Sequence, residues 1–104
     1  MLANTCRPFA PMRAAVQALR AADDAETIVA EAQRMRATAA SLCDSVVILL
    51  NVAAADPTAG AVFTPEAPTL PVEALRAGRD ALLDNLRRGC LYCGGASPFA
   101  WTVQ

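Results

Sequence analysis

Apolar residues recur at helical spacing in the longest stretch of the chain that contains neither proline nor glycine. Between residues 24 and 55 they are separated alternately by four and three positions, a mean repeat of 3.5 residues. This repeat puts the apolar residues on one side of a helix and is typical of a helix that packs against a partner helix. We call this apolar row the seam. It consists of Ile28, Ala32, Met35, Ala39, Leu42, Val46, Leu49 and Ala53.

A shorter helix is predicted before the long one, over about residues 11–22. Pro11 suits the first turn of a helix, where its missing N–H costs no hydrogen bond. Apolar and polar residues then alternate with helical periodicity. Asp23, with Glu26 three positions later, predicts an N-terminal cap for a long helix over 24–55. The connection is so short that the two helices should be antiparallel neighbours.

The second half of the chain predicts a connector, a third helix and a tail. Pro57 should end the long helix, and residues 56–69 form a proline-rich connector. The third helix is expected over 70–88, with an apolar stripe that Arg79 interrupts. A glycine follows this helix and suits its C-terminal cap. Residues 90–104 then make up an aromatic C-terminal tail.

These elements predict an all-α chain that forms a single helical domain over residues 1–104. The long helix would span about 48 Å, and the two flanking helices about 18 and 27 Å, so each half would be only a two-helix hairpin. Such hairpins leave much of an apolar seam uncovered. We therefore expect a homodimer in which two long helices pair through their seams and complete a four-helix bundle.

Composition argues against catalysis and against several classes of partner. The chain has no histidine, and its nine basic residues are all arginine, so the commonest general base, nitrogen metal ligand and Schiff-base nucleophile are missing. We expect no enzymatic activity. A net charge of −1 gives no field that would attract nucleic acid. The N-terminal residues do not resemble a secretory signal, which favours the cytoplasm, and the arginine and alanine content suggests a bacterial or phage genome.

Cys90 and Cys93 form a C-x-x-C pair followed by two glycines, which resembles half of a zinc site. A structural zinc ion needs four ligands, and the remaining thiols are the isolated Cys6 and Cys43. A redox dithiol is a second alternative, although such pairs normally open a helix, and this pair follows one. We expect inert thiols and no cofactor, with a zinc or redox switch at Cys90 and Cys93 as the alternative.

A second alternative is a small membrane-associated protein. Residues 37–55 are largely apolar and approach the length that spans a bilayer. Asp44 and Asn51 lie within this stretch, and an aspartate near the bilayer centre costs about 2.5–3.5 kcal/mol. We therefore expect no membrane insertion.

The tail contains Tyr92, Phe99 and Trp101, three of the five aromatic residues of the chain. Left in water, they would form an apolar patch of the size that marks a binding site. We expect the tail to fold back over the second half of the long helix; the alternative is docking to another protein. Overall the sequence indicates a non-enzymatic scaffold or adaptor that acts through protein–protein association at the seam.

Replacing both thiols of the C-x-x-C pair tests the reading of the cysteines as inert. Cys90→Ser combined with Cys93→Ser should leave the melting temperature nearly unchanged, with or without a chelator, when unfolding is followed by circular dichroism. A zinc ion or a disulfide would contribute several kcal/mol to folding. A loss of more than about 5 °C would therefore contradict inert thiols.

Overall fold

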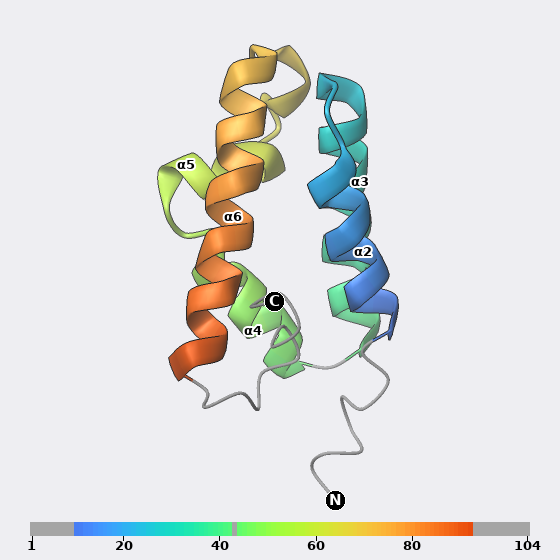
Figure 1. Ribbon diagram of the computed structural model, residues 1–104, viewed down its shortest axis with the longest axis vertical. Helices are drawn as coiled ribbons and strands as arrows, with labels where there is room; N and C mark the ends of the chain where they lie inside the picture. The colour runs from blue at the N-terminus through green and yellow to red at the C-terminus, as the bar shows by residue number, and fades with distance from the viewer. Residues whose placement is uncertain (1–9, 43, 93–104) are drawn as a thin grey trace, which may run out of the picture.

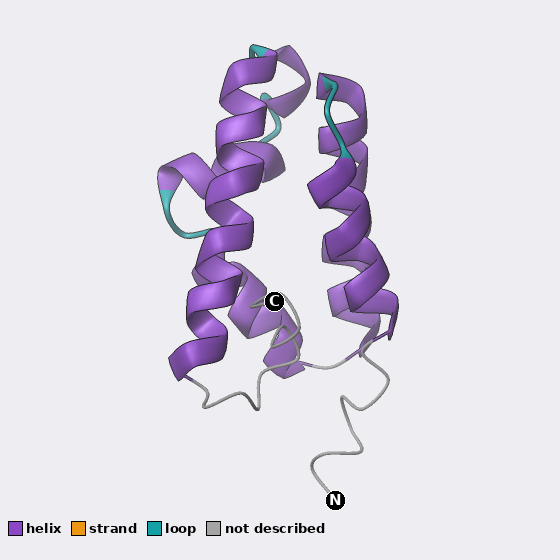
Figure 2. Ribbon diagram, in the orientation of Figure 1, coloured by secondary structure: helices purple, strands orange, loops and turns teal. Residues whose placement is uncertain are grey.

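A computed structural model describes residues 10–42 and 44–92 of the chain. Within these ranges it contains helices and no strand, which confirms the all-α prediction (Figure 2). The elements are the α-helices α2 (Ala10–Ala21), α3 (Ala25–Leu42), α4 (Asp44–Ala53), α5 (Pro57–Gly60) and α6 (Val72–Tyr92), and the 3-10 helices η1 (Ala61–Phe63) and η2 (Ala67–Thr69).

The prediction of one continuous helix over 24–55 is wrong. The segment forms two helices, α3 and α4, which run in different directions (Figure 1). Near the end of α3 the hydroxyl of Ser41 donates a hydrogen bond of 2.8 Å to the carbonyl of Thr38. Such a bond competes with the backbone ladder and favours bending. Because α4 turns away from α3, it lies beside the second half of α6.

The cap of α3 is Asp24, not Asp23 as the sequence predicts. One oxygen of Asp24 accepts from the backbone N–H of Thr27 at 3.1 Å, and the other accepts from the Thr27 hydroxyl at 2.7 Å. These bonds, the hydroxyl bond first, lower the pKa of Asp24. Asp23 instead contacts α6, since its carbonyl accepts from Nε of Arg76 at 3.0 Å and its carboxylate lies 3.3 Å from the same nitrogen.

Arg79 interrupts the apolar stripe of α6 because it caps α2. Its side chain is only 12% exposed, and one guanidinium nitrogen donates to the carbonyls of Arg20 and Ala22 at the end of α2. Its Nε donates to Asp80 at 2.6 Å. The last carbonyls of a helix have no partner within the helix, and a cation there is favourable. Arg79 therefore ties α6 to the α2–α3 turn.

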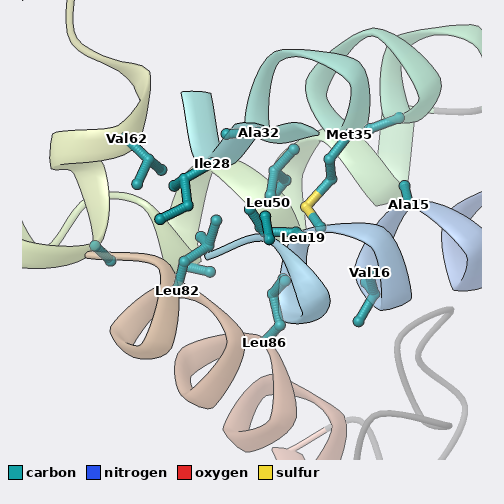
Figure 3. Packing of buried hydrophobic residues seen from close by; sticks show 14 of the residues in the cluster. Ala15, Val16, Leu19, Ile28, Ala32, Met35, Leu50, Val62, Leu82 and Leu86 are labelled. Carbon is teal, nitrogen blue, oxygen red and sulfur yellow. The ribbon is translucent and has the colours of Figure 1, made fainter. Parts of the chain in front are cut away.

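The core is assembled inside one chain, from α2, α3, α4, the 57–70 segment and α6 (Figure 3). The predicted arrangement of two separate hairpins is wrong, since α6 packs against both α3 and α4. The buried side chains that α6 contributes are Leu75, Leu82 and Leu86. Ala32 and Ala39 on α3 are fully buried, and their small size lets the helices approach closely. The chain itself thus supplies the packing that a second copy was expected to supply.

The connector between α4 and α6 is compact. Asp56 caps α5 by accepting from the backbone N–H of Thr58 at 2.9 Å. Val62 of η1 is fully buried in the core, and Phe63 is half-buried with the guanidinium carbon of Arg36 4.9 Å from its ring centre. A cation over an aromatic ring is attractive at this distance. The connector therefore covers part of the core, and the helix that follows it extends to Tyr92, beyond the predicted end at residue 88.

Gly78 allows the connector to approach α6 closely. A Cβ atom at this position would lie 2.8 Å from the carbonyl oxygen of Thr58 and 3.2 Å from Cγ1 of Val62. Because the nearer of these atoms belongs to the backbone, it cannot move aside by a rotamer change. Only glycine fits this site without shifting α5 away from α6.

Replacing Gly78 with alanine should therefore destabilise the protein by about 1–3 kcal/mol, as overpacked sites do. At an open helix position a glycine-to-alanine replacement stabilises the protein by about 1 kcal/mol. A loss of stability on Gly78→Ala would therefore indicate the close contact. Chemical denaturation measures both this variant and the control Ala77→Gly, which changes an exposed neighbour on α6. A Gly78→Ala protein more stable than the wild type would contradict the close approach.

Candidate interaction surface

Most of the predicted interface is buried within the single chain. Six of the eight seam residues are at most 4% exposed, whereas Leu42 and Leu49 are half-buried. A second copy could contact the buried ones only if the chain opened. The seam thus forms the core, and an interface with another molecule must use other side chains. The six buried seam residues are Ile28, Ala32, Met35, Ala39, Val46 and Ala53.

The outer side of α4 carries two large aliphatic side chains in water. Ile48 is 60% exposed and Val52 is 68% exposed. They are four positions apart and lie one turn from each other on the same side of the helix. Polar exposed residues, Asp44 and Asn51, adjoin them. We call Ile48 and Val52 with these neighbours the outer face of α4.

The opposite side of α4 is held firmly in the core. Val46 and Leu50 are buried there with Leu86 of α6. The amide nitrogen of Asn85 donates a hydrogen bond of 2.9 Å to the carbonyl of Ala53. This carbonyl lies in the last turn of α4, where helix carbonyls have no partner within the helix. Rotation of α4 that would bury its outer face is therefore opposed by both packing and a directional bond.

Near the end of α6, the carboxylate of Asp84 pairs with two arginines. Asp84 accepts from Arg87 at 2.7 Å and lies 2.8 Å from a guanidinium nitrogen of Arg88. The hydrogen bond from Arg87 is the main cause that lowers the pKa of Asp84, and the charge of Arg88 adds to it. The pair Arg87 and Arg88 therefore faces a carboxylate, as their spacing in the sequence predicts for a solvated helix side.

A shallow apolar groove of about 450 Å³ lies between the start of α3 and η2. Ala25, Val29 and Pro68 contribute apolar surface, and Glu26 adds a carboxylate at its edge. No sequence pattern predicts this groove, because its walls come from segments about 40 positions apart whose packing is not periodic. These side chains contain no nucleophile besides the carboxylate and no cationic group.

The predicted thiol and tail sites lie outside the described residues. This applies to Cys6, Cys43, Cys93, Phe99 and Trp101, and to the side chains of Cys90 and Tyr92. In the part of the chain that is described, no group of three or more potential metal ligands comes together. The zinc and redox alternatives are therefore untested by this geometry.

Among the described residues, no single helix is both long enough and apolar enough to cross a bilayer. The segments Asp44–Ala53 and Pro57–Phe63 meet the length and composition requirement only together, and they are bent by 113° relative to each other. The core helix of a soluble protein can meet the same requirement, so this pair is weak evidence for a span.

Comparison with known proteins gives no match, either among family models, among curated proteins or among solved structures. A functional proposal must therefore come from the residues and contacts of this chain. Its most unusual surface feature is the outer face of α4, where Ile48 and Val52 are the large hydrophobic side chains exposed among the described residues.

The ion pairs of Asp84 should make stability depend on pH in a defined direction. Because its pKa is lowered in the folded chain, their contribution is present above the ordinary value of 3.8 and is lost as the pH falls through the lower folded value. Asp84→Asn should thus lower the melting temperature at pH 7, and the gap to wild type should close in strong acid. Added salt should shrink the gap as well. An equal gap at every pH would contradict this role.

Proposed function

We propose that this chain is a non-enzymatic association protein and that its first partner is a second copy of itself. The main support is the exposure of two large aliphatic side chains on the outer face of α4, since Ile48 is 60% and Val52 is 68% exposed. Transfer of such side chains out of water is favourable by about 1.5–3 kcal/mol each when burial is complete. The absence of histidine and lysine from the chain supports a role without catalysis.

A second copy fits this face for reasons of symmetry and charge. In a twofold dimer the same surface of each copy meets itself, so an apolar pair meets an apolar pair. The sequence of α4 contains one charged residue, Asp44, at its first position, one turn before Ile48. Two copies with a net charge of −1 each repel only weakly.

The contact proposed here replaces the seam as the association surface. It would be smaller than a paired four-helix bundle, since each copy contributes two exposed aliphatic side chains and their polar neighbours. Interfaces of this size are weak and transient. A dissociation constant on the order of 100 µM is therefore expected.

Sedimentation velocity or light scattering over a range of concentrations tests the association. The mass should rise toward twice that of the chain as concentration increases. Ile48→Gln combined with Val52→Gln should keep the chain monomeric without lowering the melting temperature, because both side chains are exposed. Ala37→Gln, an exposed alanine of α3, serves as the matched control and should associate like wild type.

Three results would refute the proposal. One is a monomer at millimolar concentration, and another is association that the double substitution leaves unchanged. The third is a chain that stays monomeric but binds anionic phospholipid vesicles through Ile48 and Val52, which would assign the outer face of α4 to a membrane surface.

A further inference from the structure

We propose that the groove between the start of α3 and η2 binds a basic peptide segment of another protein. An apolar side chain of that segment lies in the groove, and a neighbouring arginine or lysine lies beside Glu26. This site is separate from the outer face of α4, which lies toward the opposite end of the molecule (Figure 1). The chain would thus associate with itself at one end and bind a different protein at the other, and neither event requires the other.

The shape of the groove suits a short chain segment. Its volume of about 450 Å³ falls within the range of about 300–1,000 Å³ that is usual for binding pockets. Ala25 and Ala30 line it on the α3 side, and Pro68 lines it on the η2 side. Because alanine side chains are short, they leave space between the helix and η2. A groove this shallow fits a segment that lies along it better than a ligand that must be enclosed.

Both walls of the groove are fixed by bonds within the chain. At the start of α3, both carboxylate oxygens of Asp24 accept hydrogen bonds from Thr27. In η2, the carbonyl of Glu66 accepts from the backbone N–H of Thr69 at 2.8 Å and from its hydroxyl at 2.7 Å. Ala67 of η2 is fully buried in the core. The groove is therefore present before a ligand arrives, which reduces the entropy that binding costs.

The charge around the groove favours a cationic ligand. Glu26 lines the groove and is exposed, and no ion pair between described residues involves its carboxylate. Asp24 and Glu66, which directly precede the two lining segments, are exposed and carry no ion pair within the described part of the chain either. Arg76 is engaged with Asp23 at 3.3 Å. A ligand cation would thus meet carboxylates that have no competing cation.

An anionic ligand fits this place poorly, although a helix begins there. The N-terminus of a helix attracts anions through its free backbone N–H groups. Here the N–H of Thr27 already donates to Asp24, and Glu26 adds a second negative charge in the first turn of α3. The positive end of the helix dipole is therefore already compensated by side chains of the chain itself.

Nuclear magnetic resonance of the isotope-labelled, full-length chain tests this site with a defined probe, the peptide acetyl-Arg-Leu-Leu-Arg-amide. The amide signals of residues 25–30, Ala67 and Thr69 should shift in a saturable way. Because the groove is shallow and the ion pair is exposed, we expect a dissociation constant on the order of 1 mM. Added salt should weaken the binding. The matched peptide acetyl-Glu-Leu-Leu-Glu-amide should not bind.

Substitutions separate the roles of charge and shape. Glu26→Gln should weaken binding about two- to five-fold, the range expected for an exposed ion pair. Ala30→Leu fills the groove from an exposed position and should abolish the shifts. The matched control Glu73→Gln removes an exposed carboxylate that does not line the groove and should bind like wild type. Ile48→Gln with Val52→Gln, which removes the proposed self-association, should also bind like wild type.

Several outcomes would overturn the proposal. One is the absence of these shifts at several millimolar peptide. Equal binding of the acidic peptide, or equal weakening by Glu26→Gln and Glu73→Gln, would overturn the role of Glu26. Shifts of residues 25–30 that appear when the protein concentration rises without peptide would assign the groove to a second copy. A chain that binds the peptide but never self-associates would refute only the association at α4.

Discussion

The fold depends on the packing of α6 against two helices that point in different directions. Leu75, Leu82 and Leu86 place the buried side of α6 against side chains of α3, α4 and the connector. Without α6, the inner side of α4 and part of the apolar row of α3 would face water, whereas α2 would still cover the rest of that row. Much of that row is alanine, which buries little area, so the contact is stabilising only where the helices approach closely. Gly78 permits such a close approach between α6 and the connector.

A core rich in small side chains fills space without strongly fixing how far one helix slides along another. Here directional hydrogen bonds from α6 fix its position along the neighbouring helices. Arg76 and Arg79 donate to backbone carbonyls of the α2–α3 turn, and Asn85 donates to the end of α4. Since each acceptor lies at or beside a helix terminus, a shift of α6 by one turn would leave these carbonyls unpaired. The polar residues thus set the register that the apolar ones stabilise.

The sequence predicts the local part of this architecture well and the tertiary part poorly. The seam repeat identified the buried side of α3, because helical periodicity is a property of neighbouring residues. Which segments cover that side depends on residues far away in the sequence. The dimer was predicted from the lengths of three helices, with residues 24–55 treated as one straight helix. The change of direction from α3 to α4 has no proline or glycine in the sequence to predict it. In the sequence, Arg79 only interrupts the apolar stripe of the third helix. Its role as a cap could not be predicted, because the carbonyls that accept its hydrogen bonds are almost 60 positions away.

The outer face of α4 shows why a candidate site can be hidden in a sequence that is apolar on every side. The seam repeat separates Val46 from Ile48 and Val52, but it leaves out Leu50, which is buried as well. The distinction arises when α6 fixes one side of α4 through packing and through the bond from Asn85. Once that side is fixed, the helix cannot rotate to bury the other. The remaining apolar area can be removed from water only by a further segment or molecule, and it must be a largely uncharged one.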